Sequence, residues 1–403
     1  MKTGLVYIYV TPFFPSSTNW RGAYCLDFVK ALRKARPQMQ VEVFVPGAGA
    51  DYEVDGIQVH RFSVKHLPSN ILPFLFSRRN EKSFLHAVTK AGILGKDIVV
   101  CHGNTANFAI YPLAVKRLNP QCKTLLQHHD LASFGLNLGV LHKCALYNAW
   151  LFRKLRALHE QIDCHVFISE ASRRSFLAAP DAGWTVYGDY KAQMRGPKAF
   201  GCRPARITES IVLHNGVDVG LFKRLAVGGE RGEFEIGCVG NFERLKDQMT
   251  LLEAVEIVNR KECASGGVGV VFVGSGPERA KCEAYANERG LDVEFRDEVK
   301  HEELPHFYRE VDLFVLPSYF EGFGCVYTEA WACGVPFIAC EGSGVADLIA
   351  AEDRGKWLCK PQEPKDLATK IASYIENKWT QKLTNTIDID ELVKEFCKQL
   401  CIL

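Results

Sequence analysis

The chain has 403 residues, of which 47% are hydrophobic and 24% are charged. These values exclude disordered, collagen-like and fibrous classes, and the length indicates two or three domains of ordinary size. The formal net charge of +2 hides an asymmetry: residues 1–200 carry 25 basic and 13 acidic side chains, a net of +12, whereas residues 201–403 carry 24 and 34, a net of −10. A basic half of this kind favours contact with a polyanion or a membrane surface.

The 15 cysteines are spread singly along the chain and form no CxxC pair. This pattern predicts reduced, buried thiols in a cytosolic protein and argues against a zinc site. The apolar run Leu5–Val10 is too short for the hydrophobic part of a secretory signal and is predicted to be a strand. No apolar stretch approaches the roughly 18–20 residues of a membrane-spanning helix, so we expect a soluble or peripherally bound protein.

Short runs of β-branched and aromatic residues alternate with stretches of helical periodicity. In the first half the predicted strands are Leu5–Val10, Val41–Val45, Ile57–Arg61, Ile98–Cys101, Thr124–Gln127 and His165–Ile168. After residue 205 they are Ile211–Leu213, Glu235–Val239, Gly269–Val273, Asp292–Phe295, Leu313–Leu316 and Pro336–Cys340. Predicted helices include Leu26–Leu32, Met249–Val258, Leu304–Glu310 and Leu367–Tyr374. The alternation predicts parallel sheets covered on both faces by helices.

The series of elements restarts in the second half. Strand Leu5–Val10, a polar loop and helix Tyr24–Lys34 correspond to strand Glu235–Val239, a second loop and helix Gln248–Asn259. We therefore predict an α/β fold with two doubly wound, Rossmann-like domains in tandem. The predicted boundaries are 1–206, 207–385 and a C-terminal helix, 386–403, for which a return to the first domain stays an open alternative. Ligands of such sheets bind at the carboxyl ends of the strands, so a cleft between the domains is the expected active site.

The most informative segment is Pro317–Ser343, which reads PSYFEGFGCVYTEAWACGVPFIACEGS. A predicted strand ends at its first residue, a turn containing glycine follows, and a helix begins near Gly324. The backbone N–H groups of Phe323, Gly324 and Cys325 are expected at that helix N-terminus, where they can hold a phosphate or a sugar oxygen.

Two glutamates flank this turn. Glu321 precedes the helix, and Glu329 lies eight residues further on, about two helical turns away. Two carboxylates around an anion-binding turn suit a sugar attached to a nucleotide. The alternative is an ordinary helix N-terminus stabilised by acidic side chains.

The spacing of the two glutamates, with the EAWACGVPFIAC that follows, resembles the E-x7-E signature of the retaining GT-B glycosyltransferases, especially family 4. Four further motifs of that family occur in its order over about residues 210–350: the NGVD turn at Asn215–Asp218, the phosphate loop at Val239–Lys246, the VGxGP turn at Val273–Pro277 and the strand Tyr308–Ser318. The resemblance implies the GT-B fold, two Rossmann-like domains that face a cleft.

The same resemblance implies a metal-independent, retaining hexosyltransferase without a cofactor. Its donor would be a UDP- or GDP-linked sugar, and its acceptor a hydroxyl of a glycan or a lipid-linked saccharide, in the synthesis of cell-surface polysaccharide or glycolipid. Two alternatives stay open, a GT-B sugar-nucleotide epimerase or hydrolase and a noncatalytic binding protein of the same fold. A dinucleotide oxidoreductase is disfavoured because no GxGxxG follows either first strand.

The resemblance also implies roles for individual residues. Glu329 would hold the ribose, Lys246 would neutralise the diphosphate, and Glu321 would orient the sugar. Asn241 replaces the arginine usual in the phosphate loop, and Arg244 is the candidate for the missing charge. The expected donor-binding residues are Asn241, Arg244, Lys246, Val299, Glu321, Phe323, Gly324, Cys325 and Glu329.

The first half resembles the family more weakly. The loop Thr11–Tyr24 retains one glycine of the pair that relatives carry, and Asn19, Arg21 and Gly22 are the expected acceptor-binding residues. The strand that ends at Gln127 is followed by two histidines. The resemblance favours His129 over His128 as the residue that faces the donor sugar, so the expected catalytic residues are Glu321, His129 and Lys246.

His102, which follows another strand, is a weaker candidate for that role, and a structural role is the alternative for each of these histidines. None of them has a convincing metal-ligand spacing.

The basic half suggests where the acceptor is found. Clusters of positive side chains recur in it, and the stretch Lys65–Arg79 mixes apolar and basic residues. The clusters are Arg33, Lys34 and Arg36; Lys116 and Arg117; and Arg153, Lys154 and Arg156. Basic clusters beside exposed apolar residues bind anionic lipid surfaces, so we expect a cytoplasmic protein with peripheral contact to the inner face of the cell membrane. Ordinary solvated faces are the alternative, and no nucleic-acid-binding module is found.

Overall fold

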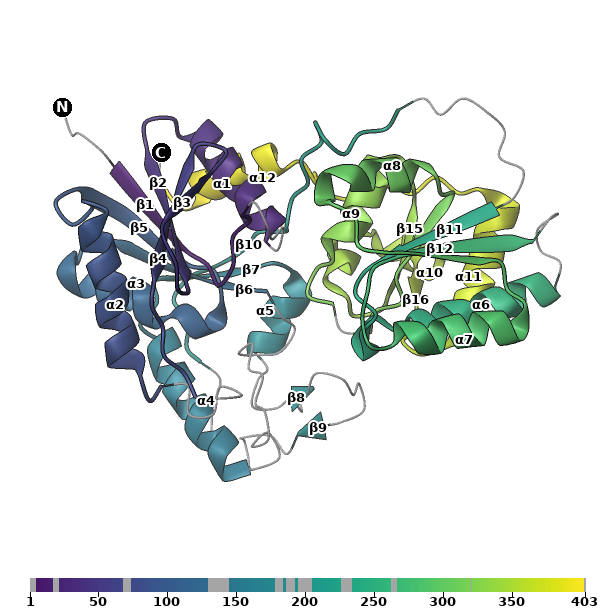
Figure 1. Ribbon diagram of the computed structural model, residues 1–403, viewed down its shortest axis with the longest axis horizontal. Helices are drawn as coiled ribbons and strands as arrows, with labels where there is room; N and C mark the ends of the chain where they lie inside the picture. Colours follow the sequence, from purple (N-terminus) through teal and green to yellow (C-terminus); the bar gives the residue numbers. More distant parts are fainter. Residues whose placement is uncertain are drawn as a thin grey trace. The chain divides into compact units, whose positions relative to one another are not determined.

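The computed structural model describes residues 5–16, 22–67, 74–129, 145–177, 184–185, 193–194, 205–225, 234–261, 267–319 and 321–401. The chain forms two compact units (Figure 1). Unit 1 is Met1–His214 together with Ile389–Leu403, and unit 2 is Asn215–Asp388.

Unit 1 is built on an eight-stranded sheet. Its strands are β1 (Leu5–Val10), β2 (Gln40–Pro46), β3 (Tyr52–Val54), β4 (Ile57–Phe62), β5 (Asp97–Gly103), β6 (Lys123–His128), β7 (Cys164–Phe167) and β10 (Ser210–Val212). Their order is β10-β7-β6-β5-β1-β2-β4-β3, and only the β3–β4 pair is antiparallel. The direction of winding reverses between β1 and β5, which is the switch point of a doubly wound sheet. Two further short strands, β8 (Trp184–Thr185) and β9 (Gln193–Met194), pair with each other.

Helices cover both faces of this sheet because alternate side chains of each strand point to opposite sides. Tyr7 and Tyr9 of β1 share a core with α1 (Ala23–Ala35) and α12 (Ile389–Gln399). Val6 and Ile8 share another with α2 (Ser77–Lys90) and α3 (Ile110–Leu118). Unit 1 also contains α4 (Ala145–His159), α5 (Glu170–Leu177) and the short helix η2 (Ala106–Phe108).

The C-terminal helix α12 returns to unit 1 and packs beside α1 (Figure 1). The rings of Phe28 and Phe396 lie 6.0 Å apart, Val393 is fully buried, and Lys34 forms an ion pair with Asp390. An apolar stripe on an amphipathic helix needs a surface to cover, and α12 finds it on the sheet that begins the chain.

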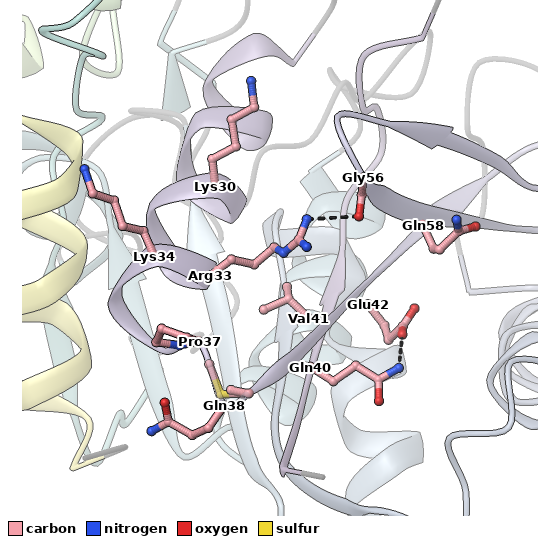
Figure 2. A pocket seen from close by; sticks show the side chains of 11 residues that line it. Lys30, Arg33, Lys34, Pro37, Gln38, Gln40, Val41, Glu42, Gly56 and Gln58 are labelled. Carbon is pink, nitrogen blue, oxygen red and sulfur yellow. Dashed lines mark hydrogen bonds between the residues drawn. The ribbon is translucent and has the colours of Figure 1, made fainter.

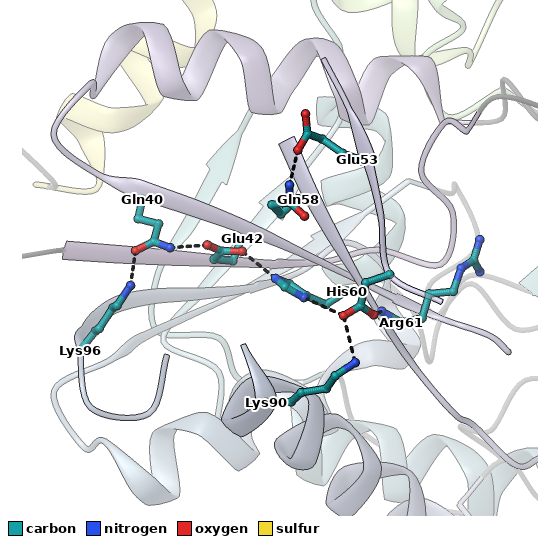
Figure 3. A network of polar contacts seen from close by, with 9 residues as sticks. Gln40, Glu42, Glu53, Gln58, His60, Arg61, Lys90 and Lys96 are labelled. Carbon is teal, nitrogen blue, oxygen red and sulfur yellow. Dashed lines mark hydrogen bonds and ion pairs between the residues drawn. The ribbon is translucent and has the colours of Figure 1, made fainter. Parts of the chain in front are cut away.

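A chain of polar contacts ties together the outer strands of the unit 1 sheet (Figure 3). His60 on β4 lies between two carboxylates, with Nε2 2.8 Å from Glu42 of β2 and Nδ1 3.4 Å from Asp51. The carboxylates, Glu42 first, raise the pKa of His60. Lys90 of α2 lies 3.3 Å from the Asp51 carboxylate, so the network links strand edge and helix.

Unit 2 is a six-stranded parallel sheet. Its strands are β11 (Phe234–Val239), β12 (Val268–Val273), β13 (Val293–Arg296), β14 (Leu313–Val315), β15 (Phe337–Cys340) and β16 (Leu358–Cys359). The order β13-β12-β11-β14-β15-β16 is that of a Rossmann sheet, with its switch point between β11 and β14.

The helices of unit 2 lie on both faces of this sheet (Figure 1). They are α6 (Gln248–Arg260), α7 (Arg279–Arg289), α8 (Leu304–Arg309), α9 (Cys325–Ala332), α10 (Arg354–Trp357) and α11 (Pro364–Asn377), with the short helices η5 (Arg244–Lys246), η6 (His301–Glu303), η7 (Gly344–Leu348) and η8 (Ala351–Asp353). Helix α6 contacts both α7 and α11, and α8 contacts α9. Among the described residues of both units, no helix has the length and apolar character to cross a membrane.

The border between the units differs from the predicted one. The predicted second domain includes the strand near residue 211, but β10 pairs with β7, and Leu213 N–H donates to the Phe167 carbonyl at 2.8 Å. The break therefore lies after His214 rather than after residue 206. A strand's pairing partner is a long-range choice that its own residues do not encode, which explains the difference.

Candidate active site

The two residues expected to carry the chemistry of unit 2 meet at the switch point of its sheet. Lys246 ends η5 in the loop after β11, and Glu321 lies in the loop after β14. Their side chains form an ion pair with 2.5 Å between Nζ and Oε2. Both are largely shielded, with side-chain exposures of 22% and 15%. A cation and a carboxylate thus share the place where ligands of doubly wound sheets bind.

Backbone contacts fix the two loops against each other. The Leu245 carbonyl accepts a hydrogen bond from Ser318 Oγ at 3.1 Å and another from Tyr319 N–H at 3.2 Å. Because Leu245 directly precedes Lys246, these bonds position the lysine relative to the strand that leads to Glu321.

The loop after β11 also lies against the loop after β12, and only glycine permits this approach. A Cβ atom at Gly274 would lie 2.2 Å from the Gly240 carbonyl oxygen, and the φ of Gly274 is +144°. The Phe242 N–H donates to the Ser275 carbonyl at 2.7 Å. The glycine-containing turn noted in the sequence therefore supports the loop that bears Lys246.

Asp247 follows Lys246 in a left-handed conformation, with φ of 53°. It stands at the start of α6, where Thr250 Oγ1 donates to its carboxylate at 2.8 Å. Burial raises the pKa of Asp247 to about 6. A non-glycine residue in this conformation stores strain, and such residues cluster at functional loops.

Glu329 lies on α9 and is buried, with 5% exposure. Its carboxylate accepts a hydrogen bond from Tyr308 Oη at 2.8 Å, and His301 Nε2 lies 3.2 Å from its other oxygen. Burial raises the pKa of the Tyr308 phenol well above its ordinary value, so Tyr308 remains a donor. Neither partner was identified from the sequence, where Tyr308 served only as part of a strand motif.

The other residues expected to bind the donor lie in the loops after β11 and β13 and at the start of α9. Asn241 and Arg244 are exposed beside Lys246, Val299 is 38% exposed, and the Phe323 side chain is buried. Gly324 precedes α9 with φ of +81°, and a Cβ there would lie 2.5 Å from the Tyr327 ring. Cys325 begins the helix and is half-buried.

Arg279, which sequence reasoning missed, clamps the loops after β12 and β13. Its guanidinium donates to the Gly274 carbonyl at 3.1 Å and to the Phe295 carbonyl at 3.2 Å, and it pairs with Asp297 at 2.6 Å. The clamp thereby supports the segment that ends at Val299.

A second group of candidate residues lies at the carboxyl ends of β5 and β6 in unit 1. His129 follows β6, and its Nε2 lies 2.6 Å from Oδ1 of Asn104, which follows β5. The Tyr24 ring packs 5.2 Å from the imidazole, centroid to centroid. Burial lowers the pKa of His129 to about 4, so the ring is neutral near pH 7. Asn104 had no signal in the sequence beyond its position after a strand.

The expected acceptor loop is described in part. Gly22 precedes α1 with φ of +87°, and a Cβ there would lie 2.9 Å from the Phe13 carbonyl oxygen. Its glycine identity therefore has a structural cause. Asn19 and Arg21 lie outside the described residues.

The two remaining histidine candidates are core residues. His102 is fully buried, with Nδ1 2.8 Å from Tyr7 Oη, and burial lowers its pKa to about 3. His128 is 4% exposed, with Nε2 2.9 Å from His165 Nδ1. His102 and His128 are thus less exposed than His129, which is half-buried.

Other features of unit 1 lie away from these residues. A groove of about 800 Å³ runs between the end of α1 and the start of β2, at the amino end of the strands (Figure 2). Its basic side chains already have partners: Lys30 pairs with Asp55, and Arg33 donates to the Gly56 carbonyl at 3.0 Å.

Among the described residues of both units, no three His, Cys, Asp or Glu side chains are arranged to hold a metal ion.

Comparison with known proteins relates this geometry to a family. Residues 225–388 match the family described as Glycosyl transferases group 1. The D-inositol 3-phosphate glycosyltransferase 2 of Catenulispora acidiphila is 30% identical over 194 residues, 44% of this chain and 44% of that protein. The sulfoquinovosyl transferase of Arabidopsis thaliana is 28% identical over 254 residues, 61% of this chain and 45% of that protein. The matched part of the chain thus spans less than half the length of these curated relatives.

The likeness to solved structures covers both units. HepE of Anabaena, solved in complex with UDP and glucose, aligns with a TM-score of 0.65 at 17% identity, over 99% of this chain and 100% of that one. At this identity the likeness concerns the fold. Together with the two sheet orders, it confirms the predicted α/β fold of two Rossmann-like, GT-B-type domains.

Proposed function

We propose that this protein, whose residues 225–388 match the family described as Glycosyl transferases group 1, transfers a sugar from a nucleotide-sugar donor to a hydroxyl group. The observation that carries the proposal is the Lys246–Glu321 pair at the switch point of the unit 2 sheet. In this proposal the lysine is the cation that binds the diphosphate, and the glutamate beside it is the carboxylate that binds sugar hydroxyls. The binding of UDP and of UDP-glucose in crystals of HepE supports this class of donor.

The transfer breaks the bond between the anomeric carbon and the diphosphate oxygen and forms a bond to the acceptor oxygen. Negative charge develops on the leaving diphosphate, and Lys246 and Arg244 would stabilise it. Glu321 would orient the sugar hydroxyls, and Glu329, held by Tyr308, would bind the ribose hydroxyls. Asn241, Val299 and the start of α9 at Phe323, Gly324 and Cys325 would complete the donor site.

We further propose that the reaction retains the anomeric configuration, as in family 4 with its E-x7-E motif. The acceptor would attack on the face that the diphosphate leaves, and the leaving phosphate would accept the acceptor proton. His129 would support the sugar, and the loop with Asn19, Arg21 and Gly22 would contact the acceptor. The positive side chains would replace a metal ion in neutralising the diphosphate.

The decisive experiment measures sugar transfer by the full chain from a panel of UDP- and GDP-sugars to glycan and lipid-linked acceptors. Lys246→Gln and Glu321→Gln should each lower the rate roughly 100-fold or more while the protein stays folded. Lys281→Gln and Glu352→Gln, which change exposed residues of the same unit, should leave it unchanged. Wild-type transfer by Glu321→Gln would refute the assignment.

The same assay separates the alternatives. Release of free sugar irrespective of acceptor indicates a hydrolase, conversion of the donor sugar indicates an epimerase, and donor binding without turnover indicates a noncatalytic protein. Analysis of the anomeric configuration of the product tests retention directly.

We also propose that the acceptor is reached at an anionic membrane, on the cytoplasmic inner face. Unit 1 exposes apolar residues beside its basic ones: Leu75 is 57% exposed next to α2, and Leu146 on α4 is 68% exposed. The segment that contains Leu75 packs against α4, because the rings of Phe74 and Trp150 lie 6.4 Å apart. Basic, apolar surfaces of this type bind anionic lipid.

Co-sedimentation with vesicles tests this proposal at low salt. Vesicles of phosphatidylglycerol and phosphatidylcholine should retain the protein, and phosphatidylcholine alone should not. Leu75→Glu and Leu146→Glu should weaken binding, whereas Leu94→Glu, at the far end of α2 and 42% exposed, should not. Absence of binding to the anionic vesicles would refute the membrane proposal and leave the sugar transfer unaffected.

A further inference from the structure

We propose that Asn104 is a positioning residue that holds His129 in the tautomer with an unprotonated Nδ1, so that the ligand group His129 contacts is a hydroxyl that donates a hydrogen bond. The identity of that hydroxyl as one of a sugar rests on the proposed function. The tautomer itself follows from contacts within unit 1.

The argument starts from a backbone carbonyl, which only accepts hydrogen bonds. Thr11 Oγ1 lies 2.9 Å from the Phe13 carbonyl oxygen and must donate its proton there. The same Oγ1 therefore acts as acceptor toward Asn104, whose Nδ2 lies 3.1 Å away. Asn104 Nδ2 also lies 3.2 Å from Cys25 Sγ. These contacts fix which end of the Asn104 amide is nitrogen.

With the amide orientation fixed, Oδ1 of Asn104 faces His129. Oδ1 only accepts, so His129 Nε2, 2.6 Å away, must carry the proton of this hydrogen bond. A neutral imidazole has one N–H, and the other nitrogen, Nδ1, is then an acceptor.

The position of Asn104 is rigid. The residue is 1% exposed, and its backbone N–H donates to the Val10 carbonyl at 2.7 Å, across the switch point between β5 and β1. The Tyr24 ring lies against the imidazole and limits its rotation. Three strand ends, after β1, β5 and β6, thereby build one hydrogen-bond chain that ends at the histidine.

Among the described residues, the titratable groups around His129 are Tyr24 and Cys25 of α1, His102 of β5 and His128 of β6. None of these is a carboxylate, so none favours the imidazolium form. Burial keeps the ring neutral, in agreement with the hydrogen-bond chain.

This arrangement selects the ligand chemistry. An unprotonated Nδ1 attracts a hydroxyl, which can donate a proton, and repels a phosphate oxygen, which near neutral pH offers lone pairs only. His129 is therefore suited to a sugar hydroxyl and not to the diphosphate. A fluorine atom in place of the hydroxyl also lacks the proton to donate.

The ring nitrogens can be examined without any ligand. In protein labelled with ¹⁵N-histidine, the resonances missing from His129→Gln identify this residue. We expect one protonated and one unprotonated nitrogen, with the proton on Nε2, from about pH 6 to about pH 8. Asn104→Ala should mix the two tautomers, and the matched change Asn119→Ala, at the start of the unit 1 strands, should not. A proton on Nδ1 in the wild-type protein would overturn the proposal.

The reaction supplies a second measurement. In Asn104→Asp a carboxylate faces Nε2–H, which raises the pKa of His129 and protonates Nδ1 as the pH falls. The acid limb of the pH–rate profile should move upward by at least one pH unit, whereas Asn119→Asp should leave it in place. A folded Asn104→Asp with the wild-type profile would refute the positioning role.

Donor analogues in which one sugar hydroxyl is replaced identify the hydroxyl that His129 contacts. For that hydroxyl, the deoxy donor and the deoxyfluoro donor should both have a kcat/KM roughly tenfold lower than the natural donor, because neither can donate a proton. That loss should shrink in His129→Gln. If the wild-type chain transfers no sugar but the ¹⁵N spectrum shows the Nε2–H tautomer, the proposed function fails and the role of Asn104 stands. An active enzyme with the proton on Nδ1 would instead refute the role of Asn104 and leave the proposed function intact.

Discussion

Acidification is expected to destabilise unit 1 selectively, because it buries several histidines in their neutral form. His102, His159 and His165 are each 0% exposed. Burial lowers their pKa values to about 3, about 3 and about 4. His165 illustrates the cause: its Nε2 lies 3.0 Å from the His159 carbonyl and its Nδ1 lies 2.9 Å from His128 Nε2, so both nitrogens are already engaged.

The direction in which pH changes the free energy of unfolding follows from proton binding in the folded and unfolded states. An unfolded histidine has a pKa of about 6.5, above the folded values, so the unfolded chain binds more protons as the pH falls. The stability these groups contribute is fully present above pH 6.5 and is lost below it. Between about pH 7.5 and about pH 5.5, each histidine lowers the free energy of unfolding by about 1.3 kcal/mol, and the three together by about 4 kcal/mol.

Two groups with raised pKa values, one in each unit, act against this loss of stability. The raised pKa of His60 acts in the opposite direction and offsets part of the loss in unit 1. In unit 2, the pKa of about 6 at Asp247 means that the folded state gains protons on acidification. That gain stabilises unit 2 by about 0.8 kcal/mol over the same interval.

Buried cysteines report on each unit separately. Cys101 and Cys164 lie next to the histidines of unit 1, and Cys238 is buried in β11 of unit 2. Urea unfolding at a series of pH values, read out by labelling with a dipyridyl disulfide and mass spectrometry, gives a midpoint for each thiol. We expect the midpoints of the two unit 1 thiols to fall steeply below pH 6.5 while that of Cys238 does not.

A variant supplies the control. His165→Gln should be less stable at every pH, yet its free energy of unfolding should fall by about 1.3 kcal/mol less than the wild-type value between the two pH limits. Parallel pH dependence in the two proteins, or equal acid sensitivity of both units, would contradict the burial of neutral histidines as the cause.

Three further predictions concern unit 2. Tyr308→Phe removes the donor to the buried Glu329 carboxylate, so nucleotide affinity measured by calorimetry should fall roughly tenfold, and unchanged affinity would disprove the coupling. Gly274→Ala should destabilise unit 2 by roughly 3 kcal/mol in urea unfolding because its Cβ meets the Gly240 carbonyl, whereas Gly290→Ala, with open space around it, should cost about 1 kcal/mol. Sugar transfer should survive dialysis against EDTA, since the proposed mechanism assigns charge neutralisation to Lys246; loss of activity that Mg²⁺ or Mn²⁺ restores would refute that assignment.

Local sequence patterns were sufficient for most of the secondary structure. The predicted strand Leu5–Val10 is β1, and the predicted strands Glu235–Val239 and Gly269–Val273 each fall one residue short of β11 and β12. The helix expected near Gly324 begins at Cys325. Apolar runs and helical periodicity report which residues are buried and which backbone conformation they prefer, and both properties are encoded by neighbours along the chain.

The tertiary structure decided which elements meet. Lys246 and Glu321 are far apart in sequence, and the loop contacts that align them, through the Leu245 carbonyl, have no sequence signature. Asn104 acquires its relation to His129 only because β5 and β6 are adjacent in the sheet. The return of α12 to unit 1 has the same origin.

The sequence alone thus predicted the class of fold, two Rossmann-like domains, which the structure confirms, and the residues that are proposed to bind a sugar nucleotide. It also showed that the first half of the chain has a net positive charge and the second half a net negative charge. The pairing of strands and the direction of each hydrogen bond in the site required the structure. The physical reason is that contacts between residues distant in the chain depend on strand order and packing, which no single segment encodes.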